Sequence, residues 1–144
     1  MNENDTVKLL RECDAGVKMG VSSINDVLTD VSSDQLRRCL TDCRNQHEIL
    51  QGEIKDALDR NCAETKDPAP IARGMSYIKT GVMLAVHDSD STIADLMTDG
   101  CNMGVKSLHR YMNQYKNADA ESKGIATRLI GLEDALAKEI RQYL

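Results

Sequence analysis

The sequence predicts an all-α protein in which four long helices form a bundle of two duplicated hairpins. Apolar residues recur at spacings of three and four along most of the chain, which is the period of an amphipathic helix. Phe and Trp are absent and only four Tyr occur, so the aromatic residues that strands favour are scarce. Two segments of the first half also match two segments of the second half. These observations favour helices packed at close range over a sheet.

The repeat relates residues 13–25 to residues 101–113, and residues 47–58 to residues 133–144. The first pair of segments shares Cys, Gly, Val, Lys and Asn at five positions, and the second pair shares Leu, Glu, Ile and Leu at four. The matched segments are 88 and 86 residues apart. So nearly constant an offset indicates the duplication of one helical hairpin.

The first hairpin is expected over residues 5–62. Its first helix follows Asn4 or Asp5, since both residue types are good N-caps, and Ser32 with Gln35 fits a capping box for the second helix. The apolar stripe of the first helix consists of Leu10, Cys13, Val17, Gly20 or Val21, Ile24, and Val27 or Leu28. The stripe of the second consists of Leu36, Leu40, Cys43, His47, Leu50, Ile54 and Leu58. Because the turn between them is short, the two helices are expected to be antiparallel neighbours.

A crossover helix over residues 68–87 and a second hairpin over residues 91–144 are expected next. Pro68 and Pro70 mark the clearest break in the chain, and proline is tolerated in the first turn of a helix, where its missing N–H would have no partner. The polar segment 87–91 is expected to end the crossover and to cap the next helix. If the crossover returns along the bundle, the second and third long helices run in the same direction. That is the up-down-down-up order of a bundle with one long crossover.

The composition narrows the class of protein. With 144 residues and a net charge of −5, the chain is expected to form a single domain, residues 1–144, that binds no nucleic acid, because no basic stripe occurs. The beginning of the chain carries charges throughout and no apolar stretch approaches ~20 residues, so we expect a cytoplasmic protein without a membrane segment. Five cysteines without CxxC spacing are then expected to be reduced thiols.

In its expected order of helices and its repeat, the chain resembles the ferritin-like superfamily. More narrowly, it resembles a small bacterial branch of unknown function in which the crossover is itself a helix. That branch has a pattern like Asp-Gly-x-x-x-Tyr on its first helix, which residues 14–20 (DAGVKMG) match loosely. Residues 46–54 stand where the branch has a polar-then-apolar motif on its second helix. The resemblance covers residues 5–144 and implies a ferritin-like bundle.

The resemblance also implies a two-metal site, which this sequence does not reproduce. Ferritin-like enzymes hold two metal ions with a Glu from each of two helices and Glu-x-x-His from each of the other two. No Glu-x-x-His occurs here, since Arg44 stands three residues before His47. Four residues could replace the single Glu ligands, and none of them falls clearly on an apolar stripe. They are Glu12, Asp14, Asp99 and Asn102. We therefore expect degenerate metal ligands.

His47 and Glu133 are the candidate site residues. They occupy equivalent positions of the repeat, and His47 interrupts a stripe that is otherwise apolar. We expect them to form a buried, hydrogen-bonded pair between their helices. The alternative is an altered site for iron, zinc or manganese, with Cys13, Cys43 or Cys101 as a neighbouring ligand. Cys13 and Cys101 are themselves repeat mates, and otherwise they are expected to fill the core.

The sequence thus predicts a non-enzymatic helical module with a role in assembly, scaffolding or stress, without a cofactor. The alternative is a metal-binding or redox protein around the pair described above. No nucleophile–base pair or phosphate-binding glycine loop is recognisable, so no catalytic residue is predicted. Glycines are unfavourable inside helices, so Gly16, Gly20, Gly100 and Gly104 predict a close approach of helices, within the chain or across a homodimer.

Overall fold

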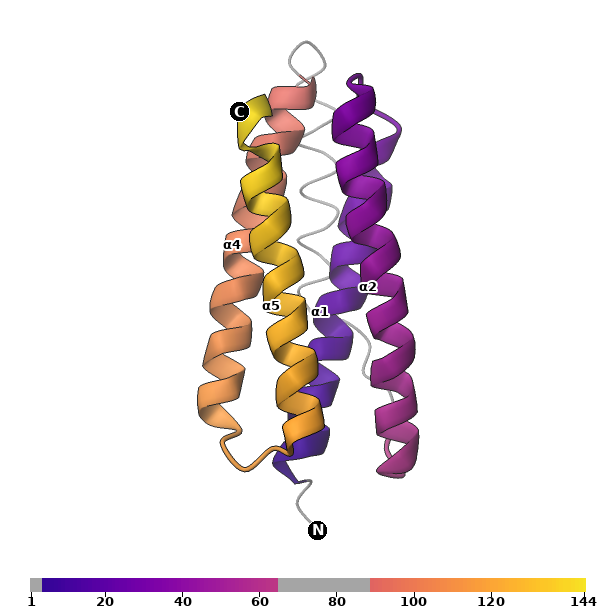
Figure 1. Ribbon diagram of the computed structural model, residues 1–144, viewed down its shortest axis with the longest axis vertical. Helices are drawn as coiled ribbons and strands as arrows, with labels where there is room; N and C mark the ends of the chain where they lie inside the picture. The colour runs from indigo at the N-terminus through magenta and orange to yellow at the C-terminus, as the bar shows by residue number, and fades with distance from the viewer. Residues whose placement is uncertain (1–3, 65–88) are drawn as a thin grey trace.

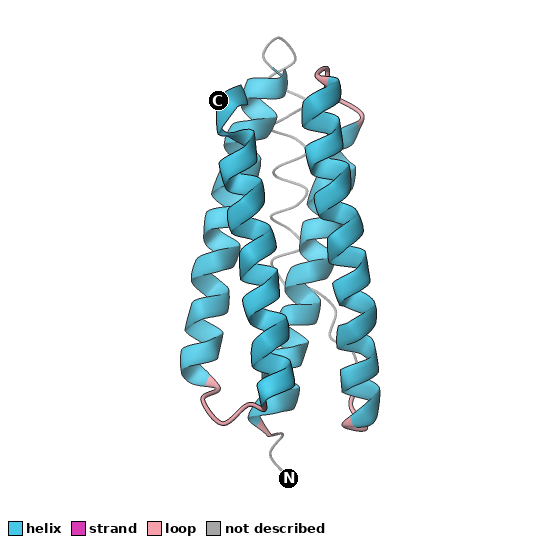
Figure 2. Ribbon diagram, in the orientation of Figure 1, coloured by secondary structure: helices cyan, strands magenta, loops and turns pink. Residues whose placement is uncertain are grey.

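The computed structural model describes residues 4–64 and 89–144 as a bundle of four long helices (Figures 1 and 2). The helices are α1 (Asp5–Leu28), α2 (Asp34–Arg60), α4 (Ser89–Gln114) and α5 (Ala120–Glu139), followed by a 3-10 turn, η2 (Ile140–Tyr143). No strand occurs in these two ranges, which confirms the predicted all-α class. The predicted crossover helix, residues 68–87, lies outside the described residues. None of the described helices is long and apolar enough to cross a membrane.

At one end of the bundle, Asp90 joins the first turn of α4 to the turn between α1 and α2. Its two carboxylate oxygens accept hydrogen bonds from the backbone N–H groups of Ser32 (2.8 Å) and Ser33 (2.9 Å). Helix α4 begins at Ser89, one residue before Asp90, so Asp90 lies inside the helix. The sequence had suggested that Asp90 belongs to a cap before the helix. Helix α2 is capped by Ser33, whose Oγ accepts from the N–H of Leu36 at 3.2 Å. The predicted capping box of Ser32 and Gln35 is therefore wrong by one residue.

At the other end, the turn between α4 and α5 is joined to the start of α1. The N–H groups of Asn117 and Asp119 donate to Asp5 Oδ2 (3.0 Å) and Thr6 Oγ1 (2.8 Å). Asn4 caps α1, as one of the two predicted residues. Helix α4 thus begins where α1 ends, and α5 begins where α1 begins. Helices α1 and α5 run in one direction and α2 and α4 in the other, which is the predicted up-down-down-up order (Figure 1).

The described residues form two apolar clusters in the interior, one toward each end, and every long helix contributes to both. The first contains Val7, Leu9, Leu10, Cys13, Val17, Leu50, Ile54, Ala57, Leu58, Leu108, Ala118, Ile125, Ala126, Leu129 and Ile130. The second contains Ile24, Val27, Val31, Leu36, Leu40, Cys43, Ile93, Ala94, Met97, Cys101, Leu136, Ala137 and Ile140. Both halves of the chain therefore share both clusters, and a thin layer of the bundle that belongs to neither cluster lies between them.

Candidate functional site

The layer between the two clusters receives one residue from each long helix. These are Gly20 of α1, His47 of α2, Gly104 of α4 and Glu133 of α5, and in each helix the residue falls between members of the two clusters. His47 is 1% exposed, and the Glu133 side chain is 14% exposed. The Nε2 atom of His47 lies 3.2 Å from Oε1 of Glu133. The predicted buried pair between α2 and α5 is therefore present.

The two glycines provide the space for this pair. A Cβ atom on Gly20 would lie 3.0 Å from Cδ2 and 3.1 Å from Nε2 of the His47 ring, closer than most real Cβ contacts. A Cβ on Gly104 would lie 3.5 Å from the Glu133 carboxyl carbon. Gly16 also has a packing role, because its Cβ would meet Leu129 at 3.8 Å. Among the described residues, a Cβ on Gly100 would have no neighbour within 4 Å, so the predicted close approach at Gly100 stays a prediction.

The hydrogen bonds of the His47 ring determine where its protons lie. Nδ1 lies 2.8 Å from the backbone carbonyl oxygen of Cys43, which can only accept, so Nδ1 carries a proton. The Cys43 thiol is a more distant second neighbour of Nδ1, at 3.5 Å. With Nδ1 protonated, the bond between Nε2 and Glu133 needs one further proton, held either by the ring nitrogen or by the carboxyl group. The pair therefore has no net charge in either arrangement.

The pKa of His47 indicates that the ring nitrogen holds this proton. Burial by itself lowers the pKa, because it disfavours the charged imidazolium. Hydrogen bonds with the side chains of Cys43 and Glu133, together with the electrostatic effects of these two side chains, outweigh burial and raise the pKa to about 10. At neutral pH the layer thus contains an imidazolium–carboxylate pair in an interior that is otherwise apolar.

The pKa values of two buried cysteines, Cys101 and Cys13, are raised. Burial, the charge of Glu133 and a hydrogen bond to its carboxylate all raise the pKa of Cys101 far above the ordinary range. Cys13 lies in the first apolar cluster. Burial, and to a smaller extent the charges of Glu12 and Asp14, raise the pKa of Cys13 to about 12. Since thiolates are the reactive form, both cysteines are poor nucleophiles and poor ligands. The structure therefore brings Cys101 and Cys43 to the pair but leaves Cys13 apart.

The carboxylates considered as metal ligands do not join the pair. Asp14 is fully buried, but Lys18, one turn along α1, forms an ion pair with it at 2.8 Å. Asp99 and Asn102 are exposed on α4. In the part of the chain that the structure describes, no three His, Cys, Asp or Glu residues are arranged to hold a metal ion. The arrangement that is observed is a hydrogen bond between His47 of α2 and Glu133 of α5, which share one proton.

The close fit of Gly20 against His47 predicts opposite effects for two Gly→Ala changes. Gly20→Ala should lower the free energy of unfolding by about 1–2 kcal/mol, because the ring is held by two hydrogen bonds and cannot move aside freely. Gly100→Ala on α4, where the added Cβ would meet none of the described residues, should raise it by up to ~1 kcal/mol through helix propensity. Urea unfolding of both variants measures the difference. Equal effects of the same sign would contradict the role given to Gly20.

A double-mutant cycle tests whether His47 and Glu133 act as a pair. His47→Leu alone should reduce the free energy of unfolding by about 3–5 kcal/mol, because it leaves a carboxylate in the interior without its partner. His47→Leu combined with Glu133→Met should recover most of this loss, since no charge then remains in the layer. Urea unfolding at constant pH provides all four values. A double variant no more stable than the single one would show that the two residues are not coupled.

The raised pKa of His47 predicts that the protein becomes less stable as pH rises. The unfolded chain releases the imidazole proton near pH 6.5, whereas the folded chain holds it up to about pH 10. The stabilisation is therefore complete below pH 6.5 and is lost between these values. Unfolding in urea between pH 6.5 and 8.5 should show a loss of about 1.4 kcal/mol per pH unit. His47→Leu should remove this dependence, and an unchanged slope in the variant would refute the assignment.

Comparison with known proteins provides no relative from which a role could be transferred. No family model matches the chain, and neither a curated protein nor a solved structure matches it.

Proposed function

We propose that this chain is a non-enzymatic, ferritin-like helical bundle that acts in the cytoplasm as a homodimeric module for assembly, scaffolding or stress. Two observations support the ferritin-like part. The helices follow the up-down-down-up order of that superfamily. His47 and Glu133 also stand on α2 and α5, the two helices that carry Glu-x-x-His in ferritin-like enzymes. In this proposal a structural ion pair occupies the place where those enzymes hold metal ions.

The observation that carries the proposal is that, in the part of the chain that the structure describes, the His47 ring is enclosed and its hydrogen bonds are made within the protein. Both ring nitrogens of His47 are engaged, and the ring is almost fully buried. Two surface hollows that described residues of α2 and α5 form are lined by other residues, without His47 or Glu133. A catalytic or ligand-binding pair requires access for a substrate or ion. A pair whose partners are all protein atoms is instead suited to specifying how helices fit together.

The second candidate function is an altered metal or redox site, and one observation favours it. The Cys43 thiol and the Cys101 thiol both lie close enough to influence the pair, which brings soft and hard ligand types into one layer. Both thiols are buried, and burial keeps Cys101 protonated. A metal ion would have to displace the proton of Cys101 and break the hydrogen bond between His47 and Glu133.

Metal analysis distinguishes the two candidates. The protein is produced in cells supplied with iron, zinc and manganese and purified without chelators, and the metal content per chain is measured. The proposal predicts less than stoichiometric metal in the natural protein and no change in His47→Leu. His109→Leu is the matched control, because His109 is exposed on α4 and is not one of the residues of the layer. Stoichiometric metal that is lost in His47→Leu and kept in His109→Leu would contradict the proposal and establish the alternative.

A further inference from the structure

The outer face of α2 and α5 has a hollow beside an exposed apolar side chain. The hollow has a volume of about 360 Å³ and is lined by Gln46, Ile49, Leu50, Arg128, Gly131 and Leu132. Ile49 is 65% exposed, the largest exposed fraction among the large apolar side chains that the structure describes. A Cβ on Gly131 would meet no atom within 4 Å. This face therefore presents one protruding apolar side chain and one recess.

The register of the two helices places the protrusion and the recess at the same height. Helices α2 and α5 are antiparallel, with His47 opposite Glu133 and Glu53 opposite Arg128. Two residues further along α2 from His47 is Ile49, and two residues back along α5 from Glu133 is Gly131. Ile49 and Gly131 are thus level with each other on neighbouring helices.

We propose that a second copy of this chain docks on the α2–α5 face, related by a two-fold axis parallel to the bundle. Such an axis places α2 of each copy over α5 of the other without changing height. Ile49 of each copy then enters the recess over Gly131 of the other, so the contact forms twice in a closed, isologous dimer. The inference rests on the proposed homodimeric module and adds the surface that forms it.

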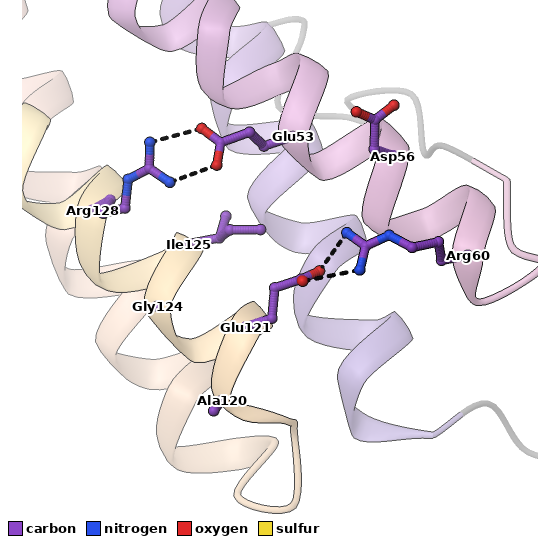
Figure 3. A pocket seen from close by; sticks show the side chains of 8 residues that line it. All are labelled: Glu53, Asp56, Arg60, Ala120, Glu121, Gly124, Ile125 and Arg128. Atoms are coloured by element: carbon purple, nitrogen blue, oxygen red, sulfur yellow. Dashed lines mark hydrogen bonds and ion pairs between the residues drawn. The ribbon is translucent and has the colours of Figure 1, made fainter.

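The charges on this face fit a second copy as well. Arg128 donates two hydrogen bonds to Glu53, both at 2.7 Å, and Arg60 donates two to Glu121, at 3.0 and 2.8 Å (Figure 3). These side chains are about half exposed. Because α2 lies over α5 of the other copy at equal height, every Glu also meets an Arg across the interface. Opposite charges therefore face each other, although the chain as a whole carries a net charge of −5.

The glycines of this face differ in their surroundings from those inside the bundle. Gly16, Gly20 and Gly104 have neighbours within 4 Å inside the bundle, whereas a Cβ on Gly52, Gly100, Gly124 or Gly131 would meet none among the described residues. Of these four, Gly131 lines the hollow beside Ile49, and Gly124 lines a second hollow of the same face, next to the two Arg–Glu pairs. Each glycine costs up to ~1 kcal/mol relative to alanine in a helix. Packing inside the described chain does not explain the two on this face. Entry of Ile49 from a second copy explains Gly131 directly.

The oligomeric state of surface variants tests the proposal. By light scattering, the natural chain should have twice its mass of 15.9 kDa. I49K, and G131L, which fills the recess, should weaken dimerisation at least about tenfold while the helical circular dichroism stays unchanged. The matched controls are M103K, since Met103 is 64% exposed, and G100L, since Gly100 is open, both on α4. These controls should remain dimers.

The outcomes separate this inference from the proposed function. A natural chain that is a monomer would overturn both this surface and the homodimer of the proposed function. A dimer that survives in I49K and G131L would overturn only this surface. Dissociation in the α4 controls but not in the α2–α5 variants would place the interface elsewhere.

A charge exchange tests the register of the interface. E53R alone places like charges against Arg128 of the other copy, and R128E alone does the same with two carboxylates, so each variant should be monomeric. In an equal mixture every Arg would face a Glu across the interface, and dimers should reappear. Because both side chains are about half exposed, each change should have little effect on the folded monomer. A mixture that stays monomeric while the natural chain dimerises would overturn the proposed axis.

Discussion

The hydrogen bond between His47 and Glu133 is the constraint on which the rest of the structure depends. Two charged groups in an apolar interior lose their hydration, and only close contact with each other and with further polar atoms compensates for that loss. The bond therefore requires room beside both side chains. Gly20 and Gly104 provide that room on the two helices that face the pair. Gly20, His47, Gly104 and Glu133, one on each long helix, are thus all required by the hydrogen bond between His47 and Glu133.

The same bond determines how α2 lies against α5. If these helices slid by one turn, His47 would meet an apolar residue and Glu133 would lose its partner, so the observed register is favoured over its neighbours. Two apolar clusters of ordinary composition do not discriminate between registers in this way, because Leu, Ile and Val can interchange places. In this register Glu53 faces Arg128, Arg60 faces Glu121, and Ile49 stands level with Gly131. The buried layer and the outer face are therefore consequences of one alignment.

The sequence predicted the parts of the fold that depend on periodicity. The four helices, the order of their directions and the contact of His47 with Glu133 followed from the spacing of apolar residues and from the repeat. The burial of Asp14 did not follow, because this residue stands one position from the apolar stripe of α1. Its shielding depends on three-dimensional packing and on the ion pair with Lys18. Ser33 rather than Ser32 caps α2, and the N–H groups of both serines are bound by Asp90, which is distant in sequence. Contacts of this kind depend on the three-dimensional fold and leave no pattern in the neighbouring sequence.

The protonation of His47 is the central claim, and nitrogen NMR of the three histidines measures it most directly. In a ¹⁵N-labelled sample, both ring nitrogens of His47 should carry protons at pH 8, with the chemical shifts of an imidazolium and slow exchange with water. His47→Leu assigns these signals. A His47 ring that carries a single proton at this pH, and gains the second near pH 6.5 like a free imidazole, would contradict the account.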